Sequence, residues 1–328
     1  MGSSNGSKME IEAWQSLVHV CQRWRNLIFG SPRRLNLQLY CSPETPTRDT
    51  LDVWPALPLL IYAEGDRASS SGMGNIIAAF RQNNRVRQVS LEKLAGWQWE
   101  EILAAMQVPF PELTGIKINL EFRPFRLSRS EDEIDETTPV IPDSFLDGSA
   151  PRLQYFELSC IPFPGLPKLL LSATRLVQLR LTDIPHSGYI SPEAMIALFP
   201  VLSSLESLFL SFNSPQSRTD LESRSLPPPK RSILPVLNVF RFHGVTEYLE
   251  ELVTHIDTPR LGTMSITFHD QIDFHCPRLT EFINYTPTLR ARDYAQVIIT
   301  DWLISVDLKY HPSCASTRAC VTSTNLTS

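Results

Sequence analysis

The chain has 328 residues, 42% of them hydrophobic and 20% charged, which is enough to bury a sizeable core and excludes both a wholly disordered chain and a disulfide-stabilised mini-protein. Its 30 basic and 35 acidic residues give a net charge of −5, which argues against a surface that holds nucleic acid by neutralising phosphates. No apolar run approaches the roughly 20 residues of a membrane-spanning helix, and no signal-peptide core is present, so we expect a cytoplasmic or nuclear protein with no membrane partner.

The N-terminal region predicts one amphipathic helix. Residues 1–12 are rich in Gly, Ser and Asn and predict a disordered leader. From Trp14 to Leu27, apolar residues recur at three- and four-residue spacing, and Gly30-Ser31-Pro32 ends the helix. Its apolar positions are Leu17, Val20, Cys21, Trp24 and Leu27.

A repeat follows the helix. Seven segments fit the pattern Leu-x-x-apolar-x-apolar, with other apolar residues allowed at the first position. They begin at Val86, Leu113, Leu153, Leu176, Leu205, Leu237 and Leu261. Shorter alternating runs at 35–39 and 59–61 extend the array at its start. A damaged unit at 289–299 extends it at its end, and we expect this unit to be frayed or rearranged.

The pattern predicts short strands with one buried face, because its last two apolar positions alternate with outward-facing ones. One unit cannot bury its own apolar face, so stacked units form a parallel sheet with helices or coil on the outside. Residues 192–199 and 245–256 are the clearest return helices. We therefore predict an α/β fold, an irregular solenoid over residues 33–308.

Three segments are expected to lie outside the regular array. An acidic loop, 122–140, and a proline-rich loop, 214–231, account for the two longest spacings between units. Residues 309–328 are rich in Ser, Thr and Ala and predict a disordered tail. Both loops are expected to protrude from one solenoid without a domain break.

No catalytic or metal-binding motif is present. The sequence lacks a Gly-x-Ser-x-Gly elbow, a phosphate-binding Gly-Lys-Ser/Thr loop and a His-Glu-x-x-His helix. The six cysteines are widely spaced, and the groups around His269 and around His311 are better explained as surface histidines and buried cysteines than as metal ligands. We expect no enzyme activity, no cofactor and no metal.

The helix and the array together resemble a known family. The run Leu17-x-x-Val20-Cys21-x-x-Trp24-Arg25-x-Leu27, followed by Ser31-Pro32, resembles the second half of an F-box. The array resembles a degenerate leucine-rich-repeat horseshoe, in which only Asn213 occupies the usual asparagine position. The whole is similar to the large fungal (mushroom) expansion of F-box proteins, although the Leu-Pro-x-Glu stretch that begins a full F-box is missing.

This resemblance implies a function. F-box proteins of this kind are substrate receptors of SCF-type cullin-RING ubiquitin ligases: the F-box binds the Skp adaptor and the array holds a protein substrate. The resemblance implies that the adaptor surface is formed by Leu17, Val20, Cys21, Trp24 and Leu27. It also implies that the protein is monomeric outside the complex. Two alternatives stay open: the helix caps the solenoid, or the chain is a stand-alone scaffold or decayed paralogue without a ligase.

The residue between the last two apolar positions of each unit should point to the open face of the sheet. Read in order, these residues are Ser90, Lys117, Glu157, Arg180, Phe209, Arg241 and Ser265. Aromatic and arginine side chains are frequent anchors of protein interfaces. We therefore expect partner recognition by Tyr155, Arg180, Phe209, Arg241 and His243, unless the proline-rich loop folds back over Phe209.

Overall fold

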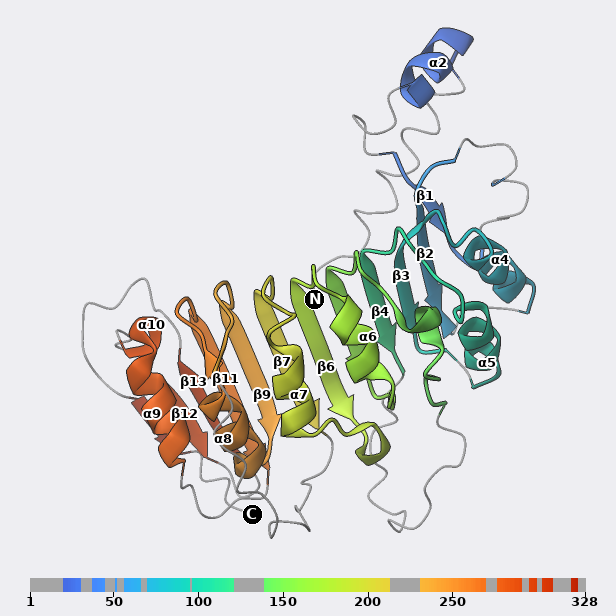
Figure 1. Cartoon of the computed structure of the whole chain (residues 1–328). Helices are drawn as coiled ribbons and strands as arrows, with labels where there is room; N and C mark the ends of the chain where they lie inside the picture. The colour runs from blue at the N-terminus through green and yellow to red at the C-terminus, as the bar shows by residue number, and fades with distance from the viewer. Residues whose placement is uncertain are drawn as a thin grey trace. The chain divides into compact units, whose positions relative to one another are not determined.

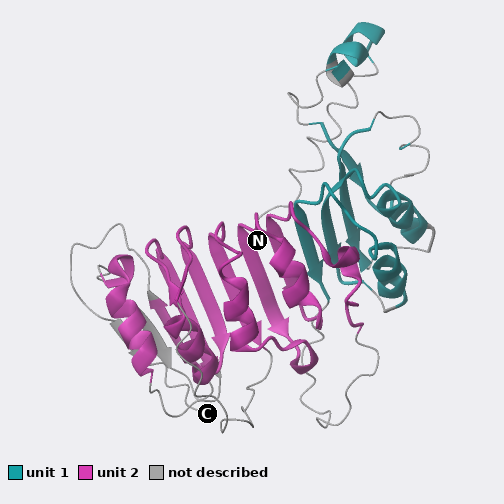
Figure 2. Ribbon diagram, viewed as in Figure 1, with its two compact units in different colours: residues 1–121 teal, residues 122–328 magenta. Residues whose placement is uncertain are grey.

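The computed structural model divides the chain into two compact units, residues 1–121 and 122–328 (Figure 2). It describes residues 20–30, 37–44, 51, 56–65, 70–94, 96–120, 139–212, 231–269, 276–290, 295–299, 303–308 and 320–323. The expected leader and nearly all of the two expected loops lie outside these ranges. The boundary between the units falls at the start of the acidic loop, and each unit is described by itself.

The described part of unit 1 contains a parallel sheet and helices. Its helices are α2 (Gln22–Gly30), α4 (Ser70–Phe80) and α5 (Gly96–Ala105). Its strands pair in chain order as β1 (Leu39–Cys41), β2 (Leu59–Glu64), β3 (Val86–Glu92) and β4 (Gly115–Asn119). The alternating burial of β2, with Leu59, Ile61 and Ala63 buried, is that of a strand with one apolar face.

Unit 2 continues the same alternation of strand and helix. Its parallel strands are β5 (Tyr155–Ser159), β6 (Gln178–Ile184), β7 (Ser207–Phe212), β9 (Val239–Gly244) and β11 (Thr263–His269). Its helical segments are η2 (Phe145–Gly148), α6 (Leu166–Ser172), η3 (His186–Gly188), α7 (Pro192–Leu198), α8 (Thr246–Thr254), α9 (Pro277–Tyr285) and α10 (Pro287–Arg290). Two short strands, β8 (Ser232–Ile233) and β10 (Ile256–Asp257), pair separately.

The two faces of the unit 2 sheet differ. Helices α6, α7, α8 and α9 lie on one face (Figure 1), where apolar side chains such as Leu179, Leu208 and Phe240 are buried. The alternate positions in the middle of the same strands, including Arg180 and Arg241, are partly or fully exposed, whereas Ser159, Thr182 and Ser211 near the strand ends are buried. We call this second surface of unit 2 the open face.

The predicted alternation of strands and helices is confirmed. Each of the seven pattern segments contains a strand, and α7 and α8 match the two expected return helices closely. The hydroxyl of Ser191 caps α7 by accepting from the backbone amide of Ala194 at 3.2 Å. The fold is thus α/β with mostly parallel strands, as the alternation predicts.

A second positional regularity appears where three strands end. Lys93, Cys160 and Asp183 each lie seven residues after the first position of their pattern, and each has a positive φ, between 51° and 60°. Residues other than glycine rarely take this left-handed conformation. These three positions therefore share a left-handed φ, although their side chains differ.

The C-terminal end differs from the expected array. After β11 the chain forms β12 (Ala295–Ile299) and β13 (Leu303–Leu308), which pair with each other in antiparallel fashion, and β13 pairs antiparallel with β11. Strand β14 (Cys320–Ser323), within the segment expected as a disordered tail, pairs with β12. The damaged unit at 289–299 is therefore rearranged, as expected, and its strand β12 pairs antiparallel with β13. No helix among the described residues has the length and apolar character needed to cross a membrane.

Candidate functional site: the open face of unit 2

Three of the predicted recognition residues lie side by side. In the register of the sheet, Arg180 on β6 is opposite Phe209 on β7, and Phe209 is opposite Arg241 on β9. This confirms the predicted order of an aromatic residue between two arginines. Neighbouring strands lie about 4.8 Å apart, so the three side chains form a continuous row across the open face. Whether the proline-rich loop covers Phe209 lies outside the described residues.

Arg180 is held by its two neighbours in the row. Its guanidinium carbon lies 4.9 Å from the centre of the Phe209 ring, within the range of a cation–π contact. On the other side, its Nε is 3.8 Å from Glu157 Oε1, which is too long for a hydrogen bond. The aromatic ring thus positions the guanidinium, and the carboxylate only partly compensates its charge.

Tyr155 and His243 extend the row in opposite directions. Tyr155 is 47% exposed at the start of β5, two residues before Glu157. His243 follows Arg241 by two residues on β9 and faces the same side. The structure thus places all five predicted recognition residues on the open face, Tyr155 two strands from Phe209 and His243 next to Arg241 along the strand.

His243 belongs to a polar chain that the sequence pattern did not reveal. The Ser211 hydroxyl lies 3.3 Å from His243 Nδ1 and donates to Asp183 Oδ1 at 3.5 Å. A serine beside a histidine is the pair used in nucleophilic catalysis, but there the histidine lies between the serine and the carboxylate. Here the serine occupies the middle and is only 2% exposed. The hydrogen bonds among Asp183, Ser211 and His243 therefore orient the His243 ring, and Ser211 is not presented as a nucleophile.

A second polar cluster, also missed from the sequence, lies on unit 1. Glu64 on β2 is opposite Glu92 on β3. Glu92 Oε1 accepts a hydrogen bond from Lys117 Nζ at 2.8 Å. Glu64 Oε1 lies 3.5 Å from Lys93 Nζ, and Glu64 Oε2 accepts a hydrogen bond from the Tyr62 hydroxyl at 3.1 Å. Each carboxylate has its own lysine. The charges of this cluster are compensated within it, so it is a weaker candidate for a charged ligand than the open face of unit 2.

Two tyrosines of this region have shifted pKa values. The rings of Tyr40 and Tyr62 stack with their centres 6.1 Å apart. Burial, together with the Glu44 and Glu92 carboxylates, raises the pKa of Tyr40 to about 12. Burial and the hydrogen bond to Glu64 raise the pKa of Tyr62 to about 12. Both phenols are therefore neutral at physiological pH and cannot act as bases there.

Helix α2 presents apolar side chains to solvent. Val20, Trp24 and Leu27 are 65%, 47% and 60% exposed, and Cys21 is also exposed. Leu17, the fifth predicted adaptor residue, lies outside the described residues. The helix ends at Gly30 as predicted but begins at Gln22, and Val20 and Cys21, expected within it, lie before it in non-helical backbone. Exposed large apolar side chains gathered on one element are typical of a binding surface.

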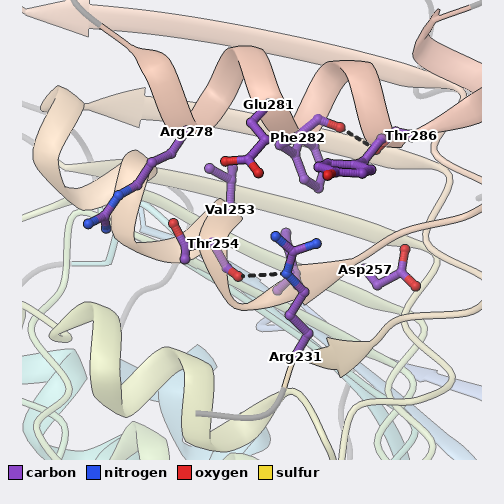
Figure 3. A pocket seen from close by; sticks show the side chains of 10 residues that line it. Arg231, Val253, Thr254, Asp257, Arg278, Glu281, Phe282 and Thr286 are labelled. Carbon is purple, nitrogen blue, oxygen red and sulfur yellow. Dashed lines mark hydrogen bonds between the residues drawn. The ribbon is translucent and has the colours of Figure 1, made fainter. Parts of the chain in front are cut away.

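The hollow shown in Figure 3 is too small for a cofactor. It lies between α8 and α9, beside the strand pair β8–β10, and is lined by Arg231, Asp257, Arg278 and Glu281 among others. Arg231 Nε donates to the Thr254 carbonyl at 3.2 Å. The cavity volume is about 30 Å³, whereas pockets for small organic ligands measure roughly 300 Å³ or more. This hollow has room for about one water molecule.

The described residues contain no group of three or more His, Cys, Asp or Glu side chains that could hold a metal ion. Most members of the two weighed histidine and cysteine groups, including His275 and His311, lie outside those residues, so the expectation of no metal stays a prediction. No protein-family model, curated protein or solved structure gives a significant match to this chain.

Proposed function

We propose that the chain is the substrate-recognition subunit of an SCF-type cullin-RING ubiquitin ligase in the cytoplasm or nucleus. Helix α2, as the remnant of an F-box, binds the Skp adaptor. The strands and helices behind it act as an irregular leucine-rich-repeat-like solenoid, and the open face of unit 2 binds the protein to be ubiquitinated. The mechanism is not catalytic, because holding a substrate near the ubiquitin-charged enzyme raises its effective concentration.

The observation that carries this proposal is the exposure of Trp24 and Leu27 on α2. If this helix capped the apolar end of a repeat array, its apolar side chains would be buried against the array. Exposure of large apolar side chains to water is unfavourable by about 25 cal/mol per Å² of apolar surface. A partner that covers this surface gains that free energy on binding. The exposure therefore favours a helix that binds another protein.

A second function is supported by the open face alone. The row of Arg180, Phe209 and Arg241 does not involve α2, so the chain could bind a partner without any ligase. We propose this stand-alone scaffold as the alternative. The two functions differ only in whether α2 binds the adaptor.

The test is capture of the chain by purified Skp adaptor. The variant Trp24→Ala with Leu27→Ala should lose capture, while Arg23→Ala with Asn26→Ala, which changes exposed polar residues of the same helix, should retain it. Circular dichroism should show equal folding of both variants. No capture of the folded wild-type chain would reject the receptor and leave the scaffold.

A further inference from the structure

The charge environment of Arg241 indicates what kind of partner the open face accepts. On the same face, the positions next to Arg241 along β9 are Val239 and His243, and those directly across are Phe209 and Ser265. The four diagonal positions on β7 and β11 are all serine or threonine. Cross-strand and diagonal neighbours reach about 5 and 8 Å, respectively. None of the eight neighbours of Arg241 carries a carboxylate.

The nearest carboxylate in the row is remote from Arg241. Ser265 is opposite Asp307 on β13, so Asp307 lies two strands from Arg241, about 10 Å away. At physiological ionic strength the Debye length is about 8 Å, which is shorter than this separation of the two strands. Screening by salt weakens the effect of the net charge of −5 on this spot. Among the described residues, Arg241 therefore presents a positive charge with no carboxylate at any neighbouring position of the sheet.

Arg180 adds a second, partly compensated charge beside the same ring. Glu157 approaches it only to 3.8 Å, through Nε. Phe209 lies between the two arginines and is itself only partly buried. An apolar ring flanked by two guanidinium groups suits a ligand that offers carboxylates next to an apolar side chain, because arginine pairs bidentately with carboxylates.

We infer that the open face binds an acidic segment of a partner protein, with aspartate or glutamate side chains on Arg241 and Arg180 and an apolar side chain on Phe209. This inference rests on the part of the proposed function that gives this face to a protein partner. It does not depend on adaptor binding. It names the chemistry of the partner, which the proposed function leaves open.

The experiment selects a phage library of random linear peptides on the immobilised full chain. Wild type should enrich peptides rich in Asp and Glu with a neighbouring apolar residue. The variant Arg180→Glu with Arg241→Glu should lose that enrichment and select Lys- and Arg-containing peptides. The control Lys168→Glu makes the same kind of charge change at an exposed position of helix α6, on the other face of the sheet, and should select as wild type does.

One selected peptide is then measured by fluorescence polarisation. We expect Arg241→Gln to weaken binding about tenfold and to reduce its dependence on salt, since a charge-assisted contact is lost. Phe209→Ala should weaken binding while the acidic preference remains. Enrichment without an acidic excess, unchanged selection by the double Glu variant, or no enrichment on folded wild type would each overturn the inference.

Adaptor capture of the same variants separates the two proposals. The double Glu variant should still be captured by Skp adaptor, because α2 is unchanged. Acidic peptides bound by a wild-type chain that the adaptor does not capture would reject the ligase function and uphold this inference. Capture by the adaptor without any selection of acidic peptides would support the ligase function and reject this inference.

Discussion

Glu250 on α8 and Leu279 on α9 are joined by a hydrogen bond of 2.8 Å from the Leu279 backbone amide to Glu250 Oε1. The other carboxylate oxygen accepts from the backbone amide of Arg278 at 3.0 Å. The residue at the N-cap of α9, Cys276, makes no side-chain capping bond. A carboxylate from a neighbouring helix therefore satisfies amides at the start of α9 that would otherwise lack partners.

This cap predicts a measurable loss of stability. Glu250→Ala should cost about 1–2 kcal/mol of unfolding free energy and speed hydrogen exchange of the Leu279 amide. Glu206→Ala, at an exposed position of the same unit, should stay within about 0.5 kcal/mol of wild type. Denaturant unfolding with amide exchange measures both. Equal effects of the two substitutions would contradict the cap.

The alternation of β6 predicts opposite outcomes for adjacent residues. Leu179 is fully buried on the helix-covered face, while Gln178 lies partly exposed on the open face. Leu179→Ala should cost about 2–5 kcal/mol, because it removes buried methyl groups and leaves a cavity. Gln178→Ala should change stability by about 0.5 kcal/mol or less. Similar costs at the two positions in thermal or chemical unfolding would reject this assignment of faces.

Tyr248 predicts a substitution that increases stability. The centre of its ring lies 4.9 Å from that of Phe212 and 5.6 Å from that of Phe242. Its buried hydroxyl has no hydrogen-bond partner among the described residues. A buried polar group without a partner costs about 1–3 kcal/mol, so Tyr248→Phe should raise the unfolding free energy by about 1 kcal/mol. Tyr155→Phe, at an exposed tyrosine, should be neutral. A destabilised Tyr248→Phe protein would show that the hydroxyl is bonded.

Stability should fall at alkaline pH through Tyr40 and Tyr62. Their pKa values of about 12 in the folded chain exceed the ordinary value of 10, so the folded state keeps both protons between pH 10 and 12 while the unfolded state releases them. The stabilisation is complete below pH 10 and is lost as the pH rises through this window. Replacing both tyrosines with phenylalanine should reduce the fall, and the part that comes from Tyr248, whose pKa burial also raises well above 10, should remain.

Absorbance at the phenolate band checks the same point directly. The folded wild-type chain should show two phenols that ionise near pH 12, and these should be absent from the double phenylalanine variant. Ionisation of all exposed and buried tyrosines together near pH 10 would contradict the shifted values. Glu64→Gln should lower the pKa of Tyr62 only in part, because burial is the larger cause.

The row on the open face could be predicted because two simple rules suffice for it. Side chains alternate along a strand, and parallel strands of equal pattern align position by position. Arg180, Phe209 and Arg241 occupy the same pattern position, so their adjacency follows. The alternation rule also predicted the buried leucines of these strands, whereas α7 followed from a separate signal, Ser191 before Pro192.

The polar chain of Ser211 and His243 could not be predicted in this way. Its third member, Asp183, reaches Ser211 where the register between β6 and β7 shifts after Leu181 and where Asp183 has a φ of 51°. An alternation pattern contains no information on such a bulge. The antiparallel β12 and β13 were missed for a related reason, because an apolar alternation of 295–299 does not encode strand direction.

The left-handed strand ends have a consequence for how this protein can diversify. Lys93, Cys160 and Asp183 lie at the ends of three different strands and have a similar left-handed φ, although their side chains are an amine, a thiol and a carboxyl group. None of the three is a β-branched residue, which would be the most strained by a positive φ. Selection can therefore change the charge and polarity at these strand ends only among side chains that tolerate a left-handed backbone, and this limits which recognition properties can evolve there.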